Sequence, residues 1–346
     1  MEKNCKSLFY TFAALCLFML LASCAAREAV VEVPKDLYWP LPPEKPRIKW
    51  VGLYSTYKDV ENKPGFIESL VGEEVGSALW RPQGVVVDPQ GNIYVADSVL
   101  SKVFVFDIVK KKLRHFGEGA QEQIALPLGL AVSPKHNMLF VAAFGSKKVI
   151  GFDLATETVK IVIGQEPGYF RNPVGVAVDE ERGRIYVTDS KLSELRAFDM
   201  TGRYLSTIAK AGSKDNELSS PSQVYVDREG RIYVADLFNF RVKVFNPDGS
   251  FRRVIGLGIG DSPGTFSRVY GVAVDSEGHI YATDANFCNV QIFDQEGRLL
   301  MAWGSPGNRP GLFIAPMHLW IDKNDRIYVT DSLNHRVQVF QYLREQ

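Results

Sequence analysis

The sequence predicts an all-β protein: a six-bladed β-propeller of four-stranded antiparallel blades, whose last blade is closed by an N-terminal strand. Three observations support this fold class. Six similar segments recur over residues 81–342, each contains short runs of β-branched and aromatic residues, and the sixth is one strand short. Such runs between Gly, Asp and Asn turns are typical of strands, and four-stranded units repeated radially form a propeller.

The first 24 residues have the pattern of a lipoprotein signal peptide. Two lysines precede an uncharged apolar stretch, residues 8–22, which is short for a membrane-spanning helix. The stretch ends in Leu-Ala-Ser-Cys at residues 21–24, which resembles the bacterial lipobox. The resemblance implies removal of residues 1–23 and a lipid anchor on Cys24 in the cell envelope, and Ala25 implies the outer membrane. An ordinary signal peptide with a cysteine at its cleavage site is the alternative.

Residues 24–46 are expected to form the lipidated cysteine and a tether. Five prolines in this segment favour extended chain over packed structure: Pro34, Pro40, Pro42, Pro43 and Pro46. The propeller is then expected over residues 47–346. A short helix is expected at residues 66–71, in the loop that leads to the first blade.

The six repeats share one register. The residue that follows the second strand is Asp97, Ala143, Asp189, Asp236, Asp284 and Asp331, with spacings of 46 to 48 residues. Each repeat has runs for four strands, except that the sixth ends soon after residues 337–340. Residues 47–54 have the composition of a lone strand, so we expect them to become the outermost strand of the last blade and to cover its open edge.

The repeats resemble NHL repeats. Their pattern is roughly Pro-x-Gly-Val-Ala-Val-Asp, then Ile-Tyr-Val-x-Asp, then Asn-x-Arg-Val-x-Val-Phe, and residues 82–88 and 331–340 match it especially well. Together with the lipobox, the chain is similar to the bacterial NHL-repeat-containing lipoproteins. This resemblance implies the fold and leaves the function open, because propellers host lyases, lactonases, RNA binders and protein-binding sensors.

Charge argues against a nucleic-acid partner. The 346 residues contain 40 Lys and Arg and 40 Asp and Glu, so the formal net charge is zero. A protein without net positive charge has no dominant electrostatic attraction to nucleic acid. One basic cluster, residues 110–112 with Arg114, does not change this expectation, and no nucleic-acid partner is expected.

The Asp that ends the second strand recurs in five of the six repeats. Catalysis rarely needs one carboxylate five times around a ring. We therefore expect this side chain to hold the following loop by accepting backbone N–H groups, and function should be sought where the repeats differ.

The repeats differ most in two sets of loops, which are expected on one face. These are the loops that lead into the innermost strands and those that join second to third strands. Two side chains replace a glycine of the other innermost strands, so they either contact a ligand at the channel mouth or only fill it. Aromatic and arginine residues in these loops are typical of protein-binding surfaces, with packing between blades as the alternative. The candidate binding residues are Gln223 and His318, then Phe144, Phe238, Phe287, Tyr270 and Arg268.

The expected function is a non-catalytic protein-binding or assembly scaffold. Its partners would be an envelope protein, a peptide or a glycan on this face, and the membrane through the Cys24 anchor. The alternative is a metal-dependent hydrolase or lyase, lactonase-like or amidating-lyase-like, with a site at the central channel.

Two comparisons weaken the enzyme alternative. The NHL-related amidating lyase binds zinc through histidines near the starts of the innermost strands, commonly beside a proline, and no histidine directly follows these prolines here. A lactonase-like site needs Glu, Asn and Asp around a divalent cation, and the spacing of Glu194, Asp284, Asn286 and Asn289 specifies none. No catalytic or metal-binding residue is therefore assigned. No cofactor is expected, although a divalent cation in the channel stays open, and a non-enzyme is favoured without activity being excluded.

Overall fold

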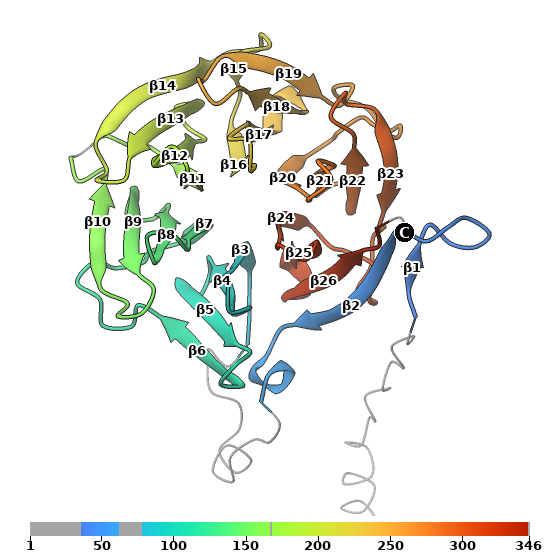
Figure 1. The fold of residues 1–346 in the computed structure, drawn as a ribbon, viewed down its shortest axis with the longest axis horizontal. Coiled ribbons are helices and arrows are strands. Elements are labelled where there is room, and N and C mark those ends of the chain that lie inside the picture. Colours follow the sequence, from blue (N-terminus) through green and yellow to red (C-terminus); the bar gives the residue numbers. More distant parts are fainter. Residues whose placement is uncertain (1–35, 62–77, 167, 345–346) are drawn as a thin grey trace, which may run out of the picture. The chain divides into compact units, whose positions relative to one another are not determined.

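The computed structural model describes residues 36–61, 78–166 and 168–344, and Asp36–Gln346 form one compact unit. The six repeats fold as six blades arranged in a ring (Figure 1), which confirms the predicted propeller. Among the described residues, no helix has the length and apolar character to cross a bilayer. The signal peptide, Cys24 and the expected helix at 66–71 lie outside the described residues.

Each blade runs from its innermost to its outermost strand in chain order. Blade 1 contains β3 (Pro82–Val87), β4 (Ile93–Asp97), β5 (Lys102–Asp107) and β6 (Lys112–Phe116). Blade 2 contains β7 (Pro127–Ser133), β8 (Met138–Ala143), β9 (Lys148–Asp153) and β10 (Val159–Ile163). Blade 3 contains β11 (Pro173–Asp179), β12 (Arg184–Asp189), β13 (Glu194–Asp199) and β14 (Tyr204–Ala211), with a short parallel β15 (Glu217–Leu218).

The remaining blades follow the same plan. Blade 4 contains β16 (Pro221–Val226), β17 (Ile232–Asp236), β18 (Arg241–Phe245) and β19 (Phe251–Ile255). Blade 5 contains β20 (Val269–Val274), β21 (Ile280–Asp284), β22 (Asn289–Phe293) and β23 (Leu299–Trp303). Blade 6 contains β24 (Pro316–Ile321), β25 (Arg326–Asp331) and β26 (Arg336–Tyr342) from its own repeat.

The missing strand of blade 6 comes from the N-terminal side, as predicted. Strand β2 (Ile48–Tyr54) pairs antiparallel with β26, with Ile48 opposite Tyr342 and Tyr54 opposite Val337. The side chains reinforce this pairing, because Trp50 Nε1 donates to Gln338 Oε1 at 3.2 Å. The edge of the last blade is thereby covered, and the two ends of the array are joined.

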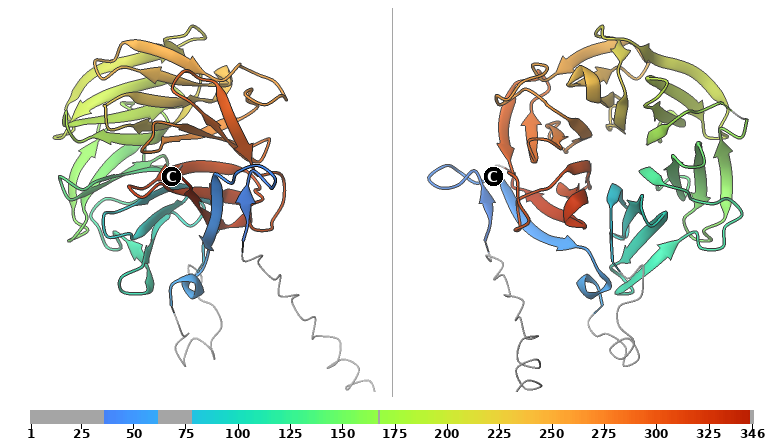
Figure 2. Two further views of the ribbon diagram at one scale, coloured as in Figure 1. Left: turned by 45° about the vertical axis from the view of Figure 1, so that its right-hand side comes forward. Right: turned by 180° about the vertical axis from the view of Figure 1, so that it is seen from behind.

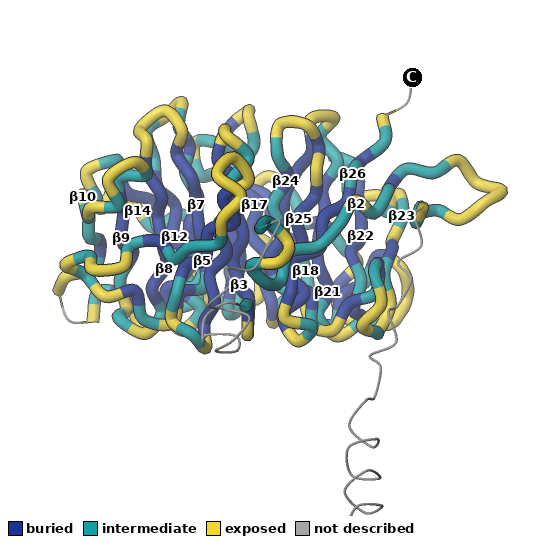
Figure 3. The backbone as a smooth tube through the Cα atoms, turned by 90° about the horizontal axis from the view of Figure 1, so that it is seen from below, coloured by how far each residue is buried: buried dark blue, intermediate teal, exposed yellow. Residues whose placement is uncertain are grey.

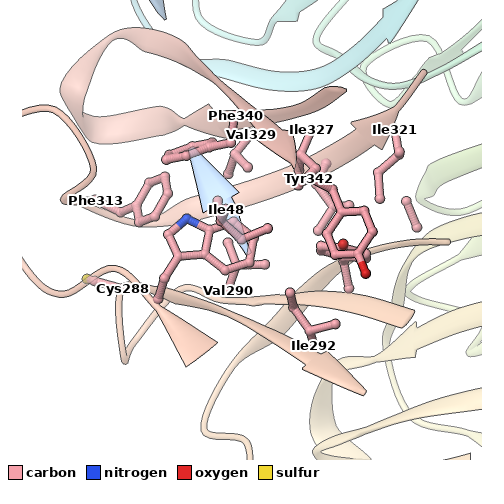
Figure 4. Packing of buried hydrophobic residues seen from close by; sticks show 14 residues of the cluster. Ile48, Cys288, Val290, Ile292, Phe313, Ile321, Ile327, Val329, Phe340 and Tyr342 are labelled. Carbon is pink, nitrogen blue, oxygen red and sulfur yellow. The ribbon is translucent and has the colours of Figure 1, made fainter. Parts of the chain in front are cut away.

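A second N-terminal strand corrects the boundary of the predicted tether. Strand β1 (Tyr38–Trp39) pairs with β2 on the rim beside β23 and β26 (Figure 2), so the propeller unit begins at Asp36 and not at residue 47. The Trp39 ring packs edge-on against Phe340, with centroids 5.9 Å apart. It packs against a cluster of buried residues that includes Ile48 and Phe313, and Figure 4 shows that cluster. The packing of this half-buried aromatic ring stabilises the pairing of β1 with the free edge of β2.

The blades hold their apolar side chains between them and expose two opposite faces. Exposed residues gather in the loops and turns at the two ends of the strands, whereas the strands between them are mostly buried (Figure 3). We call the loop face the side formed by the loops that connect one blade to the next and by those that join second to third strands. The turn face is the side formed by the remaining turns.

The innermost strands approach one another closely near the loop face. A Cβ added to Gly84 would lie 2.3 Å from the carbonyl oxygen of Leu128 in the next blade. Only glycine fits such an approach without a shift of the backbone. In blades 4 and 6 the equivalent position holds Gln223 and His318.

Candidate functional site

The repeated Asp of the second strand is a structural residue, as predicted. The Asp97 carboxylate accepts the backbone N–H groups of Trp80 at 2.6 Å and Arg81 at 2.8 Å. Its other oxygen accepts the N–H groups of Val99 and Leu100. Each such Asp therefore fastens both loops of its blade, which positions the side chains of the loop face.

Gln223 is used entirely inside the ring. Its side-chain amide donates to the Leu319 carbonyl at 2.9 Å, and its oxygen accepts the N–H groups of Val272 at 3.1 Å and Leu319 at 3.3 Å. Only 7% of the residue is exposed. Gln223 thus links the innermost strands of blades 4, 5 and 6.

His318 lies close to this link, because it directly precedes Leu319. It is 6% exposed, and burial lowers the pKa of its imidazole to about 4. The ring is therefore neutral at neutral pH. Its ring nitrogens form no hydrogen bond with other described residues.

The other predicted binding residues do not form one cluster. Phe144 and Phe287 are half-buried in blades 2 and 5, and Phe238 of blade 4 is 59% exposed. Arg268 and Tyr270 do meet, with the guanidinium 5.5 Å from the ring centroid and Nη2 3.1 Å from the hydroxyl. The predicted surface is therefore spread over several blades.

Three of the four residues considered for a metal site bind neighbouring groups, whereas the buried Asn289 Oδ1 has no hydrogen-bond partner among the described residues. Asp284 accepts the N–H groups of Ser267, Arg268 and Asn286, and Glu194 pairs with Arg196 at 2.7 Å. No group of three His, Cys, Asp or Glu side chains with the geometry of a metal site occurs in residues 36–61, 78–166 and 168–344.

Five exposed apolar residues on the loop face were not predicted from the sequence. We call them the blade-1 patch, because they lie on blades 6, 1 and 2: Ile314, Leu333, Trp80, Val99 and Leu126. The Leu333 N–H donates to the Ile314 carbonyl at 3.1 Å, and Asp97 fixes Trp80 and Val99. The Trp80 ring lies 5.4 Å from the His335 ring. The aligned repeats did contain a signal for this patch. Blades 1, 2 and 6 each have a large apolar residue one or two positions before the innermost strand: Trp80, Leu126 and Ile314.

The turn face contains a cavity of about 810 Å³, which the sequence did not indicate. Tyr225 and Trp320 line it and meet edge to face, with ring centroids 6.0 Å apart. The Trp320 indole N–H is buried and has no hydrogen-bond partner within the described chain. Asp227 and Asp322 also line this cavity.

Comparisons with known proteins agree with this architecture. The NHL repeat model matches residues 79–106 and 170–198, and a family described as a 6-bladed beta-propeller matches residues 267–345. The chain therefore contains NHL repeats and a six-bladed β-propeller domain.

Known relatives are distant and longer. The chain is 22% identical over 214 residues to Protein SUPPRESSOR OF QUENCHING 1, chloroplastic, of Arabidopsis thaliana, which covers 49% of this chain and 20% of that protein. It is 26% identical over 173 residues to NHL repeat-containing protein 2 of Gallus gallus, which covers 39% of this chain and 24% of that protein. The chain thus spans a quarter or less of their length.

Two solved structures show the fold alone. A protein of unknown function from Bacteroides thetaiotaomicron matches with a TM-score of 0.64 at 14% identity, over 84% of this chain and 75% of that one. A streptogramin B lyase matches with a TM-score of 0.59 at 12% identity, over 86% of this chain and 89% of that one.

Proposed function

We propose that this protein is a lipid-anchored NHL propeller of the bacterial envelope that acts as a non-catalytic protein-binding or assembly scaffold. Lipidation of Cys24 would anchor the protein, and the outer membrane would be its location. The partner would be an envelope protein, or a peptide or glycan, bound on the loop face.

The blade-1 patch carries this proposal. Leaving a large apolar side chain in water forgoes roughly 1.5–3 kcal/mol relative to burial. Five such side chains on three neighbouring blades favour a surface that a partner covers. Trp80, which is 59% exposed, is the expected centre, because tryptophan is enriched among residues that dominate interfaces.

Co-purification of the full chain from detergent-solubilised envelopes tests the proposal. We expect the Trp80→Ala and Leu333→Ser double variant to lose its specific partner by at least tenfold in quantitative mass spectrometry. Leu205→Ser, which changes an exposed residue of β14 outside the patch, is the matched control. Equal recovery of every co-purifying protein by wild type and double variant would contradict the proposal.

A metal-dependent hydrolase or lyase is the second candidate. The position of His318 on the innermost strand β24 favours it, because its ring nitrogens form no hydrogen bond with the described residues and imidazole is a common metal ligand. Elemental analysis of the chain purified without chelator separates the two functions: one bound equivalent of zinc or calcium would favour the enzyme.

A further inference from the structure

Residues 256–267, in the loop between β19 and β20, hold two aliphatic side chains out in solvent. Leu257 is 77% exposed and Ile259 is 71% exposed, more than any other large hydrophobic residue of the described chain. Both lie on the loop face, in the connection from blade 4 to blade 5. No role in packing accounts for them.

Hydrogen bonds hold this loop in place. The Leu257 N–H donates to the Gly264 carbonyl at 2.8 Å, and the Phe266 N–H donates to the Gly258 carbonyl at 2.9 Å. The Gln291 side chain binds the loop backbone twice, at Gly264 and Thr265. The buried Phe266 therefore anchors the loop while Leu257 and Ile259 stay exposed.

The loop face also has an excess of unpaired positive charge. In the connecting loops of blades 2 to 6, most carboxylates lie within 4.0 Å of a Lys or Arg: Glu118, Glu122, Asp215 and Glu217. Within the described part of these loops, Glu166 and Asp261 have no such partner. In blades 2 to 6, five exposed basic residues of this face form no ion pair with the described residues: Lys147, Arg171, Lys191, Arg268 and Arg309.

The direction of β1 shows on which side the preceding chain leaves the unit. Strand β2 runs toward the loop face, where Tyr54 lies opposite Val337, and β1 is antiparallel to β2. Traced backward from Trp39 to Asp36, the chain therefore heads toward the loop face, on the rim of blade 6 next to blade 5. About 12 residues separate Asp36 from Cys24, a reach of at most ~40 Å.

We propose that loop 256–267 places Leu257 and Ile259 in the headgroup region of an anionic bilayer, so that the loop face is directed at the membrane. Exposed aliphatic tips on a face that has more unpaired cations than unpaired carboxylates are a combination that favours interfacial binding to anionic lipid. The inference rests on the proposed anchoring through Cys24. In this orientation blades 4 and 5 contact the bilayer, and blade 1 lies on the opposite side of the ring. The blade-1 patch therefore stays accessible to a partner at the same membrane.

Fluorescence of a labelled full-length lipoprotein tests this contact. Ile259→Cys carries an environment-sensitive dye, and Val109→Cys, which is exposed on the turn face, is the matched control. Cys288 is buried, and lipidation would occupy the Cys24 thiol. The protein is reconstituted in vesicles of phosphatidylethanolamine and phosphatidylglycerol that contain a nitroxide-labelled lipid.

We expect at least threefold stronger quenching at position 259 than at position 109, and a smaller difference when phosphatidylcholine replaces phosphatidylglycerol. Equal quenching at the two positions would overturn the inference. So would shielding of position 259 only after an envelope protein extract is added, because the loop would then bind a protein.

A lipidation assay separates this inference from the proposed function. Incorporation of labelled palmitate that Cys24→Ser abolishes supports the anchor, whatever the dye reports. Without incorporation, the anchoring proposal fails. Vesicles are then added to the unanchored chain. Stronger quenching of the dye at position 259 than of the dye at position 109 would support the inference, because only contact of the loop with lipid produces it. Equal quenching would overturn it.

Discussion

The two faces of the propeller come from the same repeat, yet they differ in what their side chains do. On the turn face, the Asp that ends an innermost strand is bound within its own blade: Asp227 accepts from Arg231 at 2.6 Å and from the Tyr233 hydroxyl at 2.9 Å. Asp275 accepts from the Tyr281 hydroxyl in the same way. The same bond between an Asp and a Tyr hydroxyl occurs in blades 1, 4, 5 and 6, so four of the six repeats agree on the turn face.

The loop face is where the repeats diverge. Its buried Asp residues keep the loops in place, while the loops themselves vary in length and carry exposed apolar tips such as Trp80 and Leu257. A repeat protein can change its binding surface in such loops without disturbing the blade beneath them. Four predictions test this division, from the largest expected effect to the smallest.

The largest effect is expected when Asp331 is replaced by Ala beneath the loop face. The buried carboxylate lies 2.8 Å from Nε of Arg336 and accepts the Ile314 N–H. Its loss leaves a buried cation unpaired, so the free energy of unfolding should fall by about 3–5 kcal/mol in urea denaturation. Asp261→Ala, on the same face but exposed, should change it by less than about 0.5 kcal/mol. Equal losses of stability in the two variants would contradict the role of Asp331 in holding the loops in place.

Acid is expected to lower the free energy of unfolding by protonating His318 on the innermost strand of blade 6. Burial lowers the pKa of this ring to about 4, whereas the ordinary value is 6.5. The unfolded chain binds more protons between these values, so the contribution is present above pH 6.5 and is lost as the pH falls toward 4. His318 should therefore lower the free energy of unfolding by about 2 kcal/mol at pH 5 relative to pH 7.5, whereas His279, whose pKa Asp275 raises, acts in the opposite direction. If His318→Gln leaves that difference unchanged, the explanation is wrong.

A smaller effect is expected on the turn face for Tyr233→Phe. The hydroxyl donates to the Asp227 carboxylate, and loss of a hydrogen bond to a charged group should lower the free energy of unfolding by about 1.5 kcal/mol. Tyr186→Phe in blade 3 is the control, because the Tyr186 hydroxyl is buried and forms no hydrogen bond with the described residues. Thermal denaturation of both variants measures the difference, and a greater loss for Tyr186→Phe would reverse this comparison.

The smallest effect is expected for chelation. If the protein is a scaffold without a channel metal, EDTA should change its free energy of unfolding by less than about 0.5 kcal/mol. Differential scanning calorimetry with and without EDTA measures this. A large destabilisation that zinc or calcium reverses would favour the enzyme alternative.

The sequence predicted the blades and the closing strand, because periodic β-branched runs and a sixth repeat without its last strand leave few alternatives. It did not predict β1, since Tyr38 and Trp39 form a two-residue strand among prolines and the pairing depends on the free edge of β2. The bonds of Gln223 join three blades, so they follow only from the closed ring. The blade-1 patch likewise combines loops that are far apart in the chain.

Photo-crosslinking in intact envelopes would test most directly whether function lies on the loop face. A photoreactive amino acid is placed in the full chain at Trp80 and Leu333 on the loop face, and at Lys323 and Val109 on the turn face. We predict discrete adducts with one partner protein from the first two positions and none from the others. Adducts from Lys323, which lines the turn-face cavity, without adducts from Trp80 would contradict the account.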